Sequence, residues 1–273
     1  MIVLLSFGTH RADVMENIKK INHEQELYAP EVPVVGKGLF NKEYYEANRC
    51  EFEKIYSLLA DEKSKETFKN IIKYKISGKI DYLTECEEDP SEPYNSFLNN
   101  RGREVILDLG AYNGDTALEF SSVFPDYSKI IAVEPDKKTF KKLLINTEGL
   151  RDIYCHNLCV SDFSGRGFFL MNGGRNSLVG DGEETDFVTV DDLVGNENIT
   201  LIKMDVEGEE AKAIKGAKET ILKNKPRLII SAYHRTEDFL QLPKEVLGIR
   251  EDYKIYMRHF PSIPAWDTVY YFV

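Results

Sequence analysis

The sequence predicts an α/β fold built on an open, mostly parallel β-sheet. In the first observation, residues 105–109 form an apolar run typical of a buried strand, a turn with two glycines follows, and apolar residues then recur at helical spacing. The second observation repeats this pattern, because residues 129–133 form another apolar run that ends in an acid, Glu134. Strand, glycine turn and helix form the unit that binds ligands at the carboxyl edge of such a sheet.

Composition limits the class of protein and its partners. The chain has 273 residues, 42% of them hydrophobic, which suits one large domain or one domain with an N-terminal appendage. Its formal net charge of −11 argues against a general binder of nucleic acid or anionic membranes, and no apolar run approaches the length of a membrane span. Four cysteines make no disulfide framework in a chain of this size, and they lack a second Cys/His pair with metal-binding spacing. We therefore expect a cytoplasmic protein with no nucleic-acid partner and no membrane span.

The first 93 residues predict a mainly helical extension. Residues 1–35 begin with a short strand-like run before a helical pattern, which fits either an extra β–α unit or the remnant of a second lobe. Residues 41–77 carry apolar stripes at helical spacing, which suit a lid, an oligomer contact or a cap that only covers the core. An acidic segment with two prolines at 84–95 resembles a linker, so we begin the main domain at residue 94 and extend it to 273.

The turn within residues 108–116 predicts a ligand site. Gly110 permits a sharp bend, and Gly114 permits a ligand to lie close to the main chain. We expect N–H groups at the start of the next helix to hold ligand oxygens, and the Asp108 carboxylate to suit a ligand that carries an ammonium group. The spacing Gly-x-x-x-Gly fits the dinucleotide fingerprint Gly-x-Gly-x-x-Gly poorly.

Two further strand ends belong to the same predicted edge. Glu134 follows the glycine turn at the distance of the acid that accepts both ribose hydroxyls of a bound nucleoside in such folds. A third strand at 153–160 is expected to end at Ser161 and Asp162. Residues 163–190 then predict a β-hairpin insertion with a glycine-rich tip, in which Arg175, Asn176 and Ser177 either line a pocket beside the site or form plain surface.

Polar side chains also follow two later strands. Four more strands are predicted, at 199–204, 227–233, 253–259 and 268–273. Asp205 and Glu207 directly follow the first of these, and His234 follows the second. Because ligands of open α/β sheets lie outside the carboxyl ends of the strands, these side chains are further candidates for the site.

Four blocks of sequence resemble one enzyme family. They are Asp-Leu-Gly-Ala-Tyr-Asn-Gly-Asp-Thr at 108–116, Ala-Val-Glu-Pro-Asp at 132–136, Ile-Lys-Met-Asp-Val-Glu-Gly-Glu at 202–209 and Ile-Ser-Ala-Tyr-His at 230–234. The first block looks like motif I of class I S-adenosylmethionine-dependent methyltransferases, and the set resembles the FkbM family over about residues 94–273. The resemblance implies a Rossmann-like fold with a mostly parallel seven-stranded sheet and an antiparallel last strand. It also implies S-adenosylmethionine as cofactor and methyl transfer, usually to oxygen.

The resemblance further implies a set of cofactor-binding residues at the carboxyl edge of the sheet. They are Asp108, Gly110, Tyr112, Asn113, Gly114, Asp115, Thr116, Glu134, Pro135, Ser161, Asp162 and Asp205. Asp162 would accept from the exocyclic amino group of adenine, although Ser161 and Asp162 are equally typical of an ordinary turn.

We predict that His234, Asp205 and Glu207 form the catalytic group. If strand order follows the superfamily, the strands that end at 204 and 233 are neighbours, so the three side chains converge. His234 would then accept the proton of the acceptor hydroxyl, and an adjacent carboxylate would orient its ring. Asp205 could instead contact the methionine part of the cofactor, and Glu207 could cap the following helix. Since Asp-x-Glu is a weak metal signal, we predict no metal site.

The leading functional hypothesis is an S-adenosylmethionine-dependent O-methyltransferase. Its acceptor would be a small molecule or glycan, with the hydroxyl on a sugar, a polysaccharide or a secondary metabolite. One alternative is a non-catalytic S-adenosylmethionine-binding module of a larger assembly. A second is an NAD-dependent oxidoreductase, which the glycine spacing disfavours. The acceptor and the oligomeric state do not follow from the sequence.

Overall fold

The computed structural model describes residues 2–170, 178–179 and 183–273. By its internal contacts the chain divides into two compact units. The first unit comprises Met1–Glu92, Ser231–Pro243 and Lys254–Tyr271, and the second comprises Pro93–Ile230, Lys244–Tyr253 and Phe272–Val273. The first unit therefore contains two late segments of the chain besides the N-terminal extension.

Helices predominate before residue 105, and helices and strands alternate from residue 105 to residue 156. The helices are α1 (Ala12–Glu24), α2 (Lys42–Ala47), α3 (Arg49–Leu58), α4 (Glu62–Ser77), α5 (Asp81–Thr84), α6 (Glu92–Ser96), α7 (Asp115–Val123), α8 (Lys137–Asn146), α9 (Val190–Val194), α10 (Glu210–Gly216), α11 (Lys218–Asn224) and α12 (Asp238–Ile249). The strands are β1 (Ile2–Leu4), β2 (Glu26–Tyr28), β3 (Val105–Leu109), β4 (Lys129–Val133), β5 (Ile153–His156), β6 (Cys159–Val160), β7 (Gly165–Leu170), β8 (Leu178–Val179), β9 (Glu183–Val188), β10 (Leu201–Met204), β11 (Arg227–Ser231), β12 (Ile255–His259) and β13 (Thr268–Phe272).

The main sheet has seven strands in the order β12-β13-β11-β10-β3-β4-β5. From β11 to β5 each strand runs parallel to its neighbour, and Leu201 on β10 pairs with both Ile106 and Arg227. The connection from β12 to β13 spans only residues 260–267, which is too short for a parallel crossover, so β13 runs antiparallel to β12. The predicted α/β fold with a mostly parallel seven-stranded sheet is confirmed.

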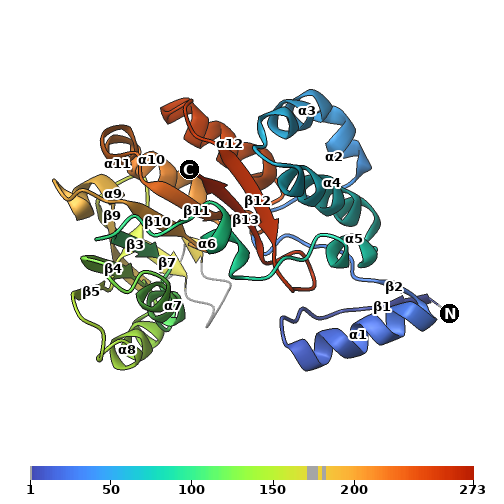
Figure 1. Cartoon of the computed structure of the whole chain (residues 1–273), viewed down its shortest axis with the longest axis horizontal. Coiled ribbons are helices and arrows are strands. Elements are labelled where there is room, and N and C mark those ends of the chain that lie inside the picture. Colours follow the sequence, from blue (N-terminus) through green and yellow to red (C-terminus); the bar gives the residue numbers. More distant parts are fainter. Residues whose placement is uncertain (1, 171–177, 180–182) are drawn as a thin grey trace. The chain divides into compact units, whose positions relative to one another are not determined.

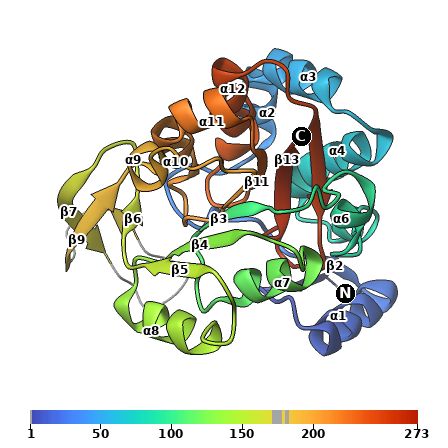
Figure 2. The ribbon, with the colours of Figure 1, turned by 60° about the vertical axis from the view of Figure 1, so that its left-hand side comes forward.

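Helices cover both faces of the parallel strands in the second unit. Figures 1 and 2 show α7 and α8 on one side of β3, β4 and β5, and α10 and α11 on the other. Because both faces are covered, β3 and β4 are buried from their second residue to their last. This explains why they appear in the sequence as continuous apolar runs without alternation.

The predicted third strand is divided in two, which corrects the expectation for residues 153–160. Only β5 joins the main sheet, whereas β6 pairs in parallel with β9 in a separate sheet of order β6-β9-β7-β8. The break falls at Asn157, whose side-chain amide donates to the carbonyls of Glu134 and Pro135 at 2.8 and 2.9 Å. Apolar pattern alone could not reveal this tertiary anchor.

The predicted β-hairpin is confirmed as part of the smaller sheet. β7 and β9 pair antiparallel, with Gly167 opposite Thr185. The predicted pocket residues Arg175, Asn176 and Ser177 lie outside the described residues.

The first unit joins helices to the strand β12. Helix α4 begins at Asp61, whose side chain accepts from the Ser64 N–H at 2.8 Å, and it ends at the left-handed Gly78. The Ser64 hydroxyl in turn accepts from the N–H of Met257, and the fully buried Arg258 forms ion pairs of 2.7 Å with Asp61 and with Glu92. This network ties α4 to β12, so residues distant in sequence share one core.

Two further features concern the whole described chain. All four cysteines are free. Over the described ranges, no helix combines the length and the apolar character that a membrane crossing requires.

Candidate functional site

The glycine turn connects β3 to α7 and lies against two neighbouring strands. The N–H groups of Gly110 and Ala111 both donate to the carbonyl of Val133, at 3.0 and 2.9 Å, which ties the turn to the end of β4. Gly110 has φ of +76°, and the place of a Cβ is already filled by the backbone carbonyl of Asp205. Both the backbone conformation and this close approach therefore require glycine here.

Gly114 is required for a reason that differs from the expected one. Its φ is +91°, and a Cβ would lie 2.7 Å from Thr147 Cγ2 and 3.1 Å from Leu143 Cδ1. The space that we expected for a ligand is thus filled by side chains of α8 and its C-terminal end. Gly114 serves the packing of the protein itself.

The N–H groups at the start of α7 already have acceptors within the turn. Gly114 donates to the carbonyl of Ala111 at 2.8 Å, and Asp115 donates to the Asn113 side chain at 3.2 Å. Thr116 donates to the Asp115 carboxylate at 2.8 Å. The expectation that these groups stand ready for ligand oxygens is therefore not met in this conformation. A ligand would have to displace or share these bonds.

Glu134 lies at the carboxyl end of β4 and faces the turn. Its two carboxylate oxygens accept from the backbone N–H groups of Tyr112 at 3.0 Å and Asp136 at 2.8 Å. Burial raises the pKa of this carboxyl to about 7, although the two N–H donors act in the opposite direction. Each oxygen keeps a further acceptor position, so the carboxylate can still receive hydroxyl protons from a ribose. The residues present thus fit a bound nucleoside.

Tyr112 and Pro135, both close to Glu134, differ in their contacts. Tyr112 has a left-handed φ of 45° and is 48% exposed. The Pro135 carbonyl accepts from the Asn157 amide. Asn157 was not a candidate from the sequence, because nothing in its local pattern shows that β5 brings it beside Glu134.

Asp108 faces a cation that the protein itself provides. It is fully buried on β3, directly opposite Lys203 on β10, and its carboxylate lies 3.3 Å from the Lys203 Nζ. Lys203 Nζ also donates to the carbonyl of Gly110 at 2.8 Å. The ammonium group that Asp108 was expected to bind in a ligand is therefore matched by a side chain of the next strand.

Ser161 and Asp162 lie elsewhere than predicted. They follow β6 in the smaller sheet, so they do not stand at the carboxyl end of a strand of the main sheet. Ser161 is buried, its N–H donates to Val188 at 3.0 Å, and its carbonyl fills the place of a Cβ on Gly216. Asp162 is exposed. Their proposed contact with adenine remains a prediction from the family resemblance.

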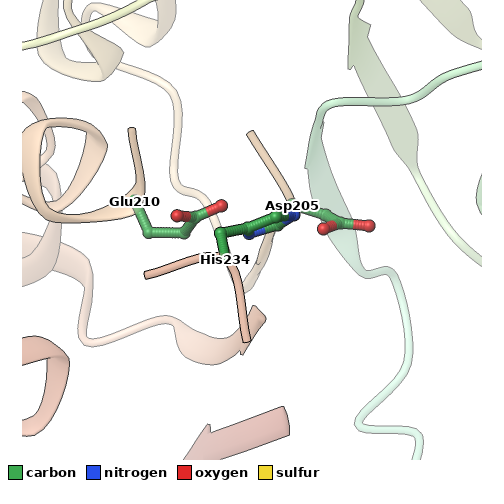
Figure 3. A group of neighbouring side chains, drawn as sticks. All are labelled: Asp205, Glu210 and His234. Atoms are coloured by element: carbon green, nitrogen blue, oxygen red, sulfur yellow. The ribbon is translucent and has the colours of Figure 1, made fainter. Parts of the chain in front are cut away.

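The carboxyl ends of β10 and β11 carry the predicted catalytic residues. Met204 on β10 pairs with Ile230 on the parallel β11, so the chain leaves both strands at the same edge. Figure 3 shows Asp205, Glu210 and His234 as neighbouring side chains, and one ligand atom from each lies within 4.8 Å of the other two. The catalytic group of Asp205, Glu207 and His234 stays a prediction, and the group that could hold a metal ion contains Glu210 as its second carboxylate.

Glu210 caps the loop that precedes α10. Its carboxylate accepts from the N–H groups of Val206 at 2.9 Å and Gly208 at 3.3 Å. Glu207 itself adopts a left-handed φ of 54°. The sequence contained three acids at 207, 209 and 210, and only the turn geometry decides which of them points back to the loop.

The same group could hold a divalent cation. It offers two carboxylate oxygens and one imidazole nitrogen, which are ligands that transition metals accept in proteins. His234 and Glu210 are buried, and Asp205 is half-buried. The sequence did not predict this set, because Glu210 was not among its candidate ligands.

Comparisons with known proteins bear on the family and the fold of this chain. The model of the methyltransferase FkbM domain matches residues 108–260. The curated 2-O-methyltransferase NoeI of Sinorhizobium fredii is 28% identical over 197 residues, which cover 60% of this chain and 78% of that protein. The crystal structure of methyltransferase FkbM from Methylobacillus flagellatus is similar with a TM-score of 0.78 and 25% identity, over 100% of this chain and 73% of that chain.

Proposed function

Because this chain belongs to the methyltransferase FkbM domain family, we propose that it is an S-adenosylmethionine-dependent O-methyltransferase. The observation that carries the proposal is the family match over residues 108–260, which includes the glycine turn, Glu134 and His234. Its similarity to a 2-O-methyltransferase favours oxygen as the methylated atom. We propose a hydroxyl of a sugar, a polysaccharide or a secondary metabolite as the acceptor.

The proposed cofactor supplies a methyl group that is already activated by its sulfonium. Glu134 would accept the ribose hydroxyls, since both of its oxygens keep an acceptor position beside the Tyr112 and Asp136 N–H groups. The bend at Gly110 would bring the main chain of the turn close to the nucleoside. These residues position the donor, and no covalent chemistry is required of them.

His234 is the proposed general base. A hydroxyl is a weak nucleophile, and a positioned imidazole can accept its proton as methyl transfer proceeds. Asp205, which belongs to the same side-chain group, would favour the protonated ring and fix its orientation. His234 is only 1% exposed, so an acceptor hydroxyl would reach the ring only after neighbouring groups move.

Calorimetry tests the cofactor, and an acceptor screen tests the reaction. S-adenosylmethionine and S-adenosylhomocysteine should both bind, and a panel of hydroxylated sugars and phenols should reveal turnover as S-adenosylhomocysteine release. Mass spectrometry and NMR of the product would then locate the new methyl group. Binding of NAD in place of both ligands would overturn the proposal in favour of an oxidoreductase.

The alternative of a non-catalytic binding module gives a different result. It predicts cofactor binding without turnover on any acceptor, and no effect of His234→Ala on the function of the assembly. The buried imidazole beside a carboxylate favours the enzyme, because a module that only binds the cofactor does not need a proton acceptor there.

A further inference from the structure

Lys203 lies next to the glycine turn and forms ion pairs with two carboxylates, Asp108 and Asp205. Its side chain is 12% exposed, and its Nζ lies 3.3 Å from Asp108 and 3.8 Å from Asp205. The third group near this nitrogen is the Gly110 carbonyl, which accepts a hydrogen bond of 2.8 Å. The ammonium therefore donates a hydrogen bond to the Gly110 carbonyl and forms ion pairs with the two carboxylates.

Asp108 depends on Lys203 for its charge. It is fully buried, and among the described residues neither of its oxygens accepts a hydrogen bond, so the contact with Lys203 at 3.3 Å is an ion pair. Burial raises the pKa of Asp108, and the nearby Lys203 opposes that rise. For Lys203, burial lowers the pKa, but the charges of Asp108 and Asp205 raise it overall. Each group therefore favours the charged form of the other.

The position of Lys203 links three parts of the candidate site. Lys203 pairs with Asp108 in the register of β10 and β3, so its side chain starts beneath the turn. Lys203 donates to the Gly110 carbonyl and thereby helps to hold the turn. The Tyr112 N–H of the same turn donates to the Glu134 carboxylate. Loss of the ammonium would remove one of the bonds that fix the turn, beside those from Gly110 and Ala111 to Val133, and would loosen the N–H that holds the Glu134 carboxylate.

We propose that Lys203 is a positioning residue for cofactor binding, and that Asp108 acts through Lys203 and not on the ligand directly. The inference rests on the proposed function. It replaces the simpler idea that Asp108 accepts the ammonium group of the cofactor's methionine portion. The two ideas differ in which part of the ligand loses binding affinity when each side chain is changed.

A pair of ligands separates the two ideas. S-adenosylhomocysteine carries the amino and carboxylate groups, whereas 5′-methylthioadenosine has the same nucleoside without them. If Lys203 holds the turn, Lys203→Met weakens both ligands by a similar factor, about tenfold, because the nucleoside site itself is disturbed. Asp108→Asn should also weaken both ligands alike, but less, since Lys203 keeps its bond to Gly110.

Titration calorimetry on the full chain measures these affinities, with Lys212→Met as the matched control. Lys212 is 43% exposed and pairs with Glu209 at 2.6 Å, so its loss should leave both affinities unchanged. Unchanged binding in Lys203→Met, or a loss confined to S-adenosylhomocysteine in either variant, would overturn the inference. If Lys203→Met does not fold, Asp108→Asn alone decides between the two ideas. Failure of the unaltered chain to bind S-adenosylhomocysteine would overturn the proposed function and this inference together. If the unaltered chain binds, unchanged affinities in Lys203→Met or a loss confined to S-adenosylhomocysteine overturn only the inference.

Discussion

The backbone carbonyl of Asp205 occupies the space that a Cβ on Gly110 would need, so the glycine turn packs directly on the carboxyl end of β10. The contact joins two parts of the site that are distant in sequence, and it allows almost no adjustment because both partners are backbone. A change at Gly110 should therefore disturb the fold and the site together.

Gly110→Ala should lower the free energy of unfolding by about 2 kcal/mol or more, because a left-handed conformation alone costs an L-residue about 1–2 kcal/mol and the carbonyl of Asp205 must also move. Urea denaturation measures the change. Gly248→Ala is the control, since this glycine lies in α12 with nothing within 4 Å of the added Cβ. There alanine should be neutral or stabilising. Equal stability of the two variants would contradict the packing argument.

Glu134→Gln should make cofactor binding weaker and less sensitive to pH. The pKa of Glu134 is raised to about 7 by burial, and only the ionised carboxylate can accept two hydroxyl protons. In the unaltered protein the affinity for S-adenosylhomocysteine should therefore fall about tenfold from about pH 8 to about pH 6. Calorimetry at several pH values measures this slope, and a slope that persists in Glu134→Gln would assign the titration to another group.

The stability of the unliganded protein should show the opposite dependence. Because the folded-state pKa of Glu134 lies above its ordinary value of 4.5, folding favours the protonated form. That contribution is fully present below the ordinary value and is lost as the pH rises through about 7. Denaturation of the unaltered chain and of Glu134→Gln should thus differ most in slope between these pH values. Parallel curves would show that the carboxyl is not perturbed.

His234→Ala should lower turnover by about a hundredfold or more, with cofactor affinity changed little, because a positioned general base contributes about 10²–10⁴ to rate. His23→Ala is a suitable control, since His23 is exposed in the last turn of α1. Single-turnover kinetics with an identified acceptor, together with calorimetry, separate the two effects. Normal turnover in His234→Ala would remove this residue as the base.

Methyl transfer should persist after treatment with a chelator. The group of Asp205, Glu210 and His234 could hold a divalent cation. However, the sulfonium of the proposed donor is already activated, so proton removal by the imidazole suffices without a Lewis acid. Turnover before and after EDTA, and after addition of Mg²⁺, Mn²⁺ or Zn²⁺, provides the measurement. Activity that is lost with EDTA and regained with one metal would instead assign the group to metal binding.

Several features of the fold follow from local sequence patterns. The apolar runs of β3 and β4, the glycines between β3 and α7, and the acid after β4 each depend on residues only a few positions apart. Backbone preference and hydrophobic periodicity act over that range, so strand, turn and helix could be predicted there. The blocks that resemble the FkbM family identified the same edge of the sheet.

Other features were decided by tertiary structure, because they depend on which distant segments become neighbours. The sequence determined an α/β chain with a glycine turn, an acid at position 134 and polar residues after β10 and β11. It did not determine that Lys203 lies opposite Asp108, that Asn157 donates to the end of β4, or that the Glu210 carboxylate caps the loop after β10. Strand register and turn conformation bring these side chains together. Lys203 and Asp108, for example, are nearly a hundred residues apart in the sequence but pair across β10 and β3. A local pattern carries no information about such pairing, since side-chain charge can be matched only after the strands are aligned.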